Sequence, residues 1–349
     1  MIRKALAAAV CLGSLVVASY AVGTPLSASS AAPTTLRLSV TDCVCFAPEI
    51  VAIQKGWMQT LLTKYNVTLK SSYFDSGPPQ IAALVSNSLD IATVGASPTV
   101  GMISQDAPVD FFYVSDQGLG IEGLVVKSNS GIESVKDLVG KKVGVPFGTS
   151  GEFMLKAALQ VAGVNASSVP MVNLQASAIA AAWQRNDIQA AWVWYPWLAK
   201  LKQLDGRVIM LDSDVVNATK GRQNATWDIY AVRRDFAQRY PQFLRDFVAV
   251  IDRATTYTNA NKRAVADTMY SKIGAPSADS AYEQLLGDQF LTVRDNASPE
   301  WLGSPSHPGA FVDIVENVAK FLHSSGAVRT LPSTKQIENH LTSSFLTTK

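Results

Sequence analysis

Short runs of β-branched and aromatic residues alternate with longer stretches of helical hydrophobic spacing from Thr35 to about Val232. Strands that alternate with helices are typical of parallel sheets covered by helices on both faces, so the pattern predicts an α/β fold. The predicted strands are Leu36–Val40, Thr68–Phe74, Asp90–Val94, Asp110–Val114, Leu124–Lys127, Lys142–Val145, Pro170–Leu174 and Ala190–Trp194.

Helical spacing fills the gaps between these strands and then dominates the rest of the chain. Ser76 and Pro78 are a helix-start signal, and Gly56 and Gly163 break or close helices. The predicted helices are Pro48–Tyr65, Gln80–Ser88, Glu152–Ala162, Pro241–Asn259, Lys262–Ile273, Ala278–Gln289 and Ala310–Ser324.

This order of elements predicts two lobes. We expect lobe one to comprise residues 34–122 plus 232–349, and lobe two residues 123–228. Two hinge strands, at about 121–127 and 227–233, would link them.

The first 32 residues differ from the rest of the chain. Arg3 and Lys4 precede an almost unbroken small and apolar run, Ala5–Gly23, and further small residues follow. This pattern predicts a cleaved secretory signal peptide, and an uncleaved membrane anchor is the alternative. After residue 33, no apolar stretch approaches the ~20 residues that a membrane-spanning helix needs.

Charge narrows the classes of partner. Without the two basic residues of the first 32, the 30 Lys and Arg fall to 28, equal to the 28 Asp and Glu. A balanced charge without a basic run argues against a nucleic-acid or anionic-membrane partner. With only three His, and Cys43 and Cys45 the only cysteines after the signal, we predict no metal site, no cofactor and no catalytic residues. The two cysteines are either free or bonded to each other.

Two turns of small residues follow predicted strands and precede helices. One is Gly95-Ala96-Ser97-Pro98, and the other runs from Pro146 to Gly151 and includes Thr149 and Ser150. Such turns direct backbone N–H groups and hydroxyls toward an anion at a helix N-terminus. The alternative is that Ser97 and Ser150 only cap their helices.

Acidic and aromatic residues stand at other strand ends. Glu122 and Asp228 lie in the predicted hinge strands, and side by side they could hold an ammonium group. Pairing with Arg233 or Arg185 is the alternative. Trp194 ends its strand, where it could line a cleft or make a cation–π contact, although core packing explains most of the tryptophans.

The mature chain resembles the periplasmic receptors of ABC importers for taurine, alkanesulfonates and nitrate, and is most similar to the taurine receptors. The segments that carry the resemblance are Phe74–Gly77, Val94–Pro98, Glu122–Lys127, Val145–Phe147, Val172–Gln175, Ala181–Arg185 with Asp187-Ile188, Val193-Trp194 and Trp227–Phe236.

The resemblance implies a type II periplasmic-binding-protein fold that closes on a hinge around a small sulfonate, without enzymatic turnover. It implies sulfonate contacts from Ser97, Thr149 and Ser150, an amine contact from Asp228, and cleft positions for Glu122 and Trp194. We also place Ala96, in the first turn, and Cys43, in the first loop, at the ligand site. The expected partner is an ABC permease in the inner membrane, and we expect a periplasmic monomer that serves sulfur uptake.

Two departures keep alternatives open. Gly148-Thr149-Ser150-Gly151 is more similar to the alkanesulfonate branch, so receptors for other alkanesulfonates or aromatic sulfonates remain candidates. Cys43-Val44-Cys45-Phe46 is faintly similar to the cysteine-rich segment of pyrimidine-precursor synthases, which share the fold. Those enzymes are cytoplasmic and use a histidine, whereas all three histidines here lie in the last 45 or so residues.

Overall fold

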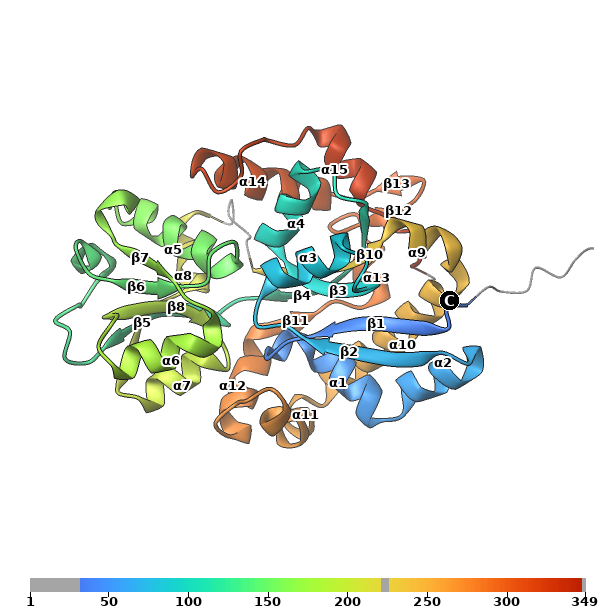
Figure 1. Cartoon of the computed structure of the whole chain (residues 1–349), viewed down its shortest axis with the longest axis horizontal. Helices are drawn as coiled ribbons and strands as arrows, with labels where there is room; N and C mark the ends of the chain where they lie inside the picture. Colours follow the sequence, from blue (N-terminus) through green and yellow to red (C-terminus); the bar gives the residue numbers. More distant parts are fainter. Residues whose placement is uncertain (1–31, 221–225, 347–349) are drawn as a thin grey trace, which may run out of the picture. The chain divides into compact units, whose positions relative to one another are not determined.

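Two β-sheets organise the computed structural model, which describes residues 32–220 and 226–346 (Figure 1). The first sheet has the strand order β11-β4-β10-β3-β1-β2, and the second has the order β7-β6-β8-β5-β9. The strands of the first sheet are β1 (Thr35–Val40), β2 (Thr68–Tyr73), β3 (Ile91–Gly95), β4 (Val109–Gly118), β10 (Trp227–Arg233) and β11 (Asp288–Phe290). Those of the second are β5 (Glu122–Lys127), β6 (Val143–Val145), β7 (Met171–Asn173), β8 (Ala190–Trp194) and β9 (Gly206–Leu211).

Each sheet is mixed, parallel at one end and antiparallel at the other. Strand β1 runs parallel to β2 and β3, whereas β10 runs antiparallel to β3 and β4. In the second sheet β6 runs parallel to β7 and β8, and β5 runs antiparallel to β8 and β9. The parallel-rich sheets that the sequence predicted are therefore confined to the parts built from strand–helix–strand units.

The two predicted hinge strands do not lie side by side. All pairing of β5 is within the second sheet, and all pairing of β10 is within the first. Glu122 and Asp228 therefore do not sit on neighbouring strands, so the side-by-side arrangement considered for an ammonium group is not met. The chain passes from one sheet to the other after Gly118, the last residue of β4, and returns to the first sheet at Trp227. The exact lobe boundaries stay a prediction.

Helices cover the sheets close to the predicted positions, with two differences. The predicted helix Pro48–Tyr65 is two helices, because Gly56 adopts a left-handed φ of 73° that interrupts the helix between them. The predicted helix Ala278–Gln289 ends at Gly287, because the next residues pair with β4 as strand β11. The helices are α1 (Ala47–Gln54), α2 (Trp57–Tyr65), α3 (Gly77–Val85), α4 (Ala96–Ser104), α5 (Ser150–Val161), α6 (Ala176–Gln184), α7 (Trp197–Gln203), α8 (Asp212–Ala218), α9 (Arg234–Arg239), α10 (Pro241–Ala260), α11 (Lys262–Met269), α12 (Ala278–Gly287), α13 (Val293–Asn296), α14 (Phe311–Ser324) and α15 (Thr334–His340).

One buried apolar cluster extends from the first sheet into the second. It includes Val94 of β3, Leu124 of β5 and Phe153 of α5. Phe153 packs edge-on against Phe321 of α14, with ring centroids 4.6 Å apart. The two lobes therefore share apolar contacts as well as two chain crossings.

In the described part of the chain, no helix combines the length and the apolar character needed to cross a bilayer. Residues 1–31 of the predicted signal peptide lie outside the described residues, so secretion stays a prediction.

Candidate functional site

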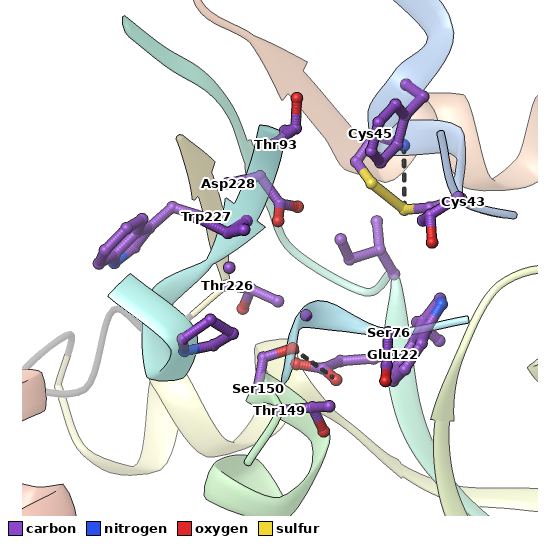
Figure 2. A pocket seen from close by; sticks show the side chains of 18 of the residues that line it. Cys43, Cys45, Ser76, Thr93, Glu122, Thr149, Ser150, Thr226, Trp227 and Asp228 are labelled. Carbon is purple, nitrogen blue, oxygen red and sulfur yellow. Dashed lines mark hydrogen bonds between the residues drawn. A yellow bond between two sulfur atoms is a disulfide. The ribbon is translucent and has the colours of Figure 1, made fainter. Parts of the chain in front are cut away.

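A small cavity lies where β3 and β10 of the first sheet approach β5, β8 and the start of α5 (Figure 2). Its volume is about 70 Å³, which is room for roughly five ordered waters. We call it the chamber. It is lined by Thr41, Cys43, Cys45, Phe46, Ser76, Gly77, Gln80, Thr93, Val94, Gly95, Pro98, Ile121, Glu122, Thr149, Ser150, Trp194, Thr226, Trp227 and Asp228.

Hydroxyl groups and a helix N-terminus form one side of the chamber. Thr149 caps α5: its side chain accepts a hydrogen bond from the N–H of Glu152 at 3.5 Å and donates one to the carbonyl of Pro146 at 2.6 Å. Ser150 is the first residue of α5, and its Oγ donates to Oε2 of Glu122 at 3.5 Å. The positive end of the helix dipole and these hydroxyls together suit an anionic group.

Glu122 is a buried acid beside this helix end. Its side chain is 1% exposed, and Oε1 has no hydrogen-bond partner. Burial raises the pKa of its carboxyl well above the ordinary value, and the charge of Asp212 raises it further. Glu122 therefore favours the neutral form while nothing positive is near it.

Asp228 lies on β10 directly opposite Gly95 of β3. A Cβ on Gly95 would lie 3.4 Å from Oδ1 of Asp228, so the glycine leaves space for the carboxyl group. Burial raises the pKa of Asp228 well above its ordinary value, and the charges of Asp116 and Glu49 add to this.

The arginines that the sequence offered as partners for these acids are engaged elsewhere. Arg233 pairs with Asp90 at 3.1 Å and with Asp235 at 3.2 Å. Arg185 pairs with Asp187 at 2.8 Å. Among the described residues that line the chamber, two are acidic and none is basic. The chamber is thus acidic and has no counter-charge of its own.

The structure brings together most, but not all, of the predicted site residues. Glu122, Asp228, Trp194, Thr149, Ser150 and Cys43 all line the chamber. Ser97 instead lines an adjoining cavity of about 160 Å³, which shares Pro98 and Thr149 with the chamber. The Oγ of Ser97 is buried there without a hydrogen-bond partner. Ala96 is fully buried and lines neither cavity.

Sequence reasoning missed several polar residues of the chamber, namely Thr41, Ser76, Gln80, Thr93 and Thr226. Ser76 was expected as a helix-start residue within the resemblance segment Phe74–Gly77 but not at the site, yet its Oγ donates to Oε1 of Gln175 in the second lobe at 3.1 Å. Thr93 donates to Oε1 of Glu49 at 3.0 Å. Its position near the carboxyl end of β3 is the signal that could have identified it.

Cys43 and Cys45 are bonded to each other, which decides between the two states left open by the sequence. Both are buried, and both line the chamber. Trp194 pairs with Glu122 across the β5–β8 ladder and packs against the cluster formed by Cys43, Cys45 and Phe46. Trp192, two residues before Trp194 in the same strand, is fully buried in the core.

Comparison with known proteins places this chain in a family. A family model described as NMT1/THI5 like matches residues 45–264. The taurine-binding periplasmic protein of Escherichia coli (strain K12) is 37% identical over 200 residues, which cover 57% of this chain and 60% of that protein. A putative aliphatic sulfonates-binding protein of Bacillus subtilis (strain 168) is 31% identical over 234 residues, 65% of this chain and 66% of that one. The matches thus span less than two thirds of the length of these two relatives.

A solved structure supports the same fold. The alkanesulfonate-binding protein SsuA from Xanthomonas axonopodis pv. citri, bound to MOPS, aligns with a TM-score of 0.71 at 18% identity, covering 89% of this chain and 99% of that one. At this identity the likeness concerns the fold alone, and it agrees with the predicted periplasmic-binding-protein architecture. The chain belongs to the NMT1/THI5-like family.

Proposed function

We propose that this protein is the substrate-binding receptor of an ABC importer and that its ligand is a small sulfonate with an ammonium group, taurine before others. One observation carries the proposal. The chamber joins an anion-favouring helix end, with the hydroxyls of Thr149 and Ser150, to two acids that lack a cation, the buried Glu122 and the half-buried Asp228. The relatives named for taurine and aliphatic sulfonates support the choice of ligand class.

Charge balance favours a zwitterion over a plain anion. A sulfonate alone would meet the acids Glu122 and Asp228 without any Lys or Arg among the described lining residues. An ammonium group on the same ligand supplies the missing positive charge, and charge-assisted hydrogen bonds are the stronger kind. The size of the chamber, about 70 Å³, fits a ligand with few atoms.

The proposed cycle is binding, closure and delivery. A ligand that contacts both lobes favours the closed form over the open one, since it gains contacts only there. The closed receptor then docks on a permease in the inner membrane, after secretion through the predicted signal peptide. We propose that it acts as a monomer and catalyses no reaction on its ligand.

Receptors for longer alkanesulfonates or aromatic sulfonates are the second candidate. The aromatic side chains of Trp194, Phe46 and Trp227 at the chamber favour an apolar tail. The small volume of the chamber argues against an aromatic ring, so we rank this candidate after taurine.

Calorimetric titration tests the proposal. We expect taurine to bind more tightly than ethanesulfonate, sulfate or nitrate. Asp228→Asn should weaken taurine binding about 10- to 100-fold, since a hydrogen bond to a charged group contributes about 1.5–3 kcal/mol. Asp187→Asn, at an exposed acid paired with Arg185, is the matched control and should bind taurine like the wild type.

Two results would reject parts of the proposal. Unchanged taurine affinity in Asp228→Asn would remove the amine contact. Mass spectrometry of the ligand after long incubation should return it unchanged, and a new product would indicate an enzyme.

A further inference from the structure

The Cys43–Cys45 bridge stands apart from the large apolar cores. With Phe46 it forms a small buried cluster, against which Ile50 and Trp194 pack. Cys43, Cys45, Phe46 and Trp194 all line the chamber, whereas Ile50 does not. The bridge therefore forms part of the chamber wall. Trp194, in β8 of the second lobe, packs against the cluster that contains the bridge.

The bridge lies across the chamber from the hydroxyl groups of Thr149 and Ser150. In the view of Figure 2 the two sulfur atoms lie on one side of the pocket, and Thr149 and Ser150 lie on the other. A ligand with its sulfonate at the hydroxyls thus directs the rest of its body toward the sulfur atoms. Sulfur and aromatic surfaces make favourable contacts with methylene groups and with each other.

The bridge is poorly suited to stabilising the whole fold. In the chain-entropy model, a disulfide stabilises more when it closes a longer loop, and only one residue separates these cysteines. Its effect is local. It fixes the turn Thr41–Phe46, in which Cys43 also caps the 3₁₀ turn Val44–Phe46 by accepting the N–H of Cys45 on its Sγ at 3.1 Å.

We propose that the Cys43–Cys45 disulfide, with Phe46 and Trp194, is the specificity wall that limits the length of the ligand's tail. This inference rests on the proposed function, because it assumes a sulfonate in the chamber. With the bridge closed, the wall admits a two-carbon aminosulfonate and rejects longer ones. Removing the sulfur atoms makes room for another methylene, and opening the bridge frees the turn Thr41–Phe46 to move away from the ligand's tail.

The test compares taurine with homotaurine, which is one methylene longer. Calorimetry on the oxidised full chain gives the ratio of the two dissociation constants, and peptide mapping verifies the bridge. In the double variant Cys43→Ala/Cys45→Ala we expect this ratio to shift toward homotaurine by about tenfold or more, the discrimination typical of one methylene.

A second arm leaves the sequence unchanged. A phosphine reductant breaks the Sγ–Sγ bond, gives two thiols with two protons from water, and leaves as the phosphine oxide. The reduced wild type should shift its ratio in the same direction as the double variant. This arm decides the question even when the variant does not fold.

The control is Val51→Ala in α1, a buried residue close in sequence that does not line the chamber. It should lower Tm and leave the ratio unchanged, which separates a role in specificity from a role in stability alone. If the ratio of the taurine and homotaurine dissociation constants is unchanged in both the double variant and the reduced protein, the bridge does not limit the length of the tail. The proposed function is then left intact. A wild type that binds neither aminosulfonate overturns the proposed function itself.

Discussion

At the scale of single residues, the acids of the chamber are the most informative groups. Asp228 has further acids, Asp116 and Glu49, among its charged neighbours, and Glu122 has Asp212. Burial and these like charges raise the pKa of both carboxyls, so without a ligand each carboxyl tends to keep its proton. An ammonium group beside them would favour the charged form and expel a proton.

This linkage predicts opposite pH dependences for two ligands that differ by one amine. Taurine should bind more tightly as pH rises above the ordinary pKa of a carboxyl, by up to about tenfold per pH unit for each proton released. Ethanesulfonate should bind more weakly over the same range, because deprotonation places negative charge beside its sulfonate. Titrations at several pH values measure both slopes. Asp228→Asn should flatten the dependence of taurine affinity on pH. Equal pH dependences for taurine and ethanesulfonate would contradict the assignment of the acids to the ammonium group.

At the scale of elements, the start of α3 lies directly against the start of α4. A Cβ on Gly77, the first residue of α3, would lie 2.5 Å from Cγ of Pro98 in α4. Both residues line the chamber. The absence of a side chain at Gly77 therefore determines how closely the two helix starts approach at the ligand site.

Gly77→Ala should push these helix starts apart. We expect a loss of about 1–3 kcal/mol of unfolding free energy, the usual effect of overpacking, together with weaker taurine binding. Gly101→Ala in α4 is the matched control, since its Cβ would meet no atom within 4 Å. It should raise stability by about 0.5–1 kcal/mol, because alanine favours the helix. Thermal unfolding measures the stability of both variants, and calorimetry measures their taurine affinity. Equal stability and equal affinity in the two variants would show that the close approach of α3 to α4 does not matter for the site.

Elements also show what the sequence could predict and what it could not. The strand Ala190–Trp194 was predicted with its observed bounds, because a short apolar run bounded by the polar Gln189 and the turn residue Pro196 marks a buried strand. Strand β11 was predicted as the end of a helix, since only its pairing with β4 makes it extended. The same limit applies to the site. Thr149 and Ser150 were found from a turn pattern, whereas the contact of Ser76 with Gln175 joins residues 99 positions apart.

At the scale of the whole molecule, polar contacts join the two lobes beside the chamber. Asp75, just before α3, accepts hydrogen bonds from Oγ and the backbone N–H of Ser177 in α6, at 2.5 and 3.3 Å. Next to it, Ser76 lines the chamber and reaches Gln175. Because the proposed opening of the lobes would break these bonds, we expect them in the closed form only.

Ser177→Ala should therefore shift the balance toward the open state. The bond is exposed, so we expect a net loss near 1 kcal/mol, which is about a fivefold rise in the dissociation constant for taurine. The unfolding free energy without ligand should change little, since the substitution leaves the buried apolar clusters intact. Small-angle scattering with taurine at a fixed, near-half-saturating concentration should give a larger radius of gyration than the wild type. Ser86→Ala, at an exposed residue after α3, is the control. If Ser177→Ala binds and scatters like the wild type, these bonds do not contribute to closure, and the apolar contact between Phe153 and Phe321 becomes the next candidate.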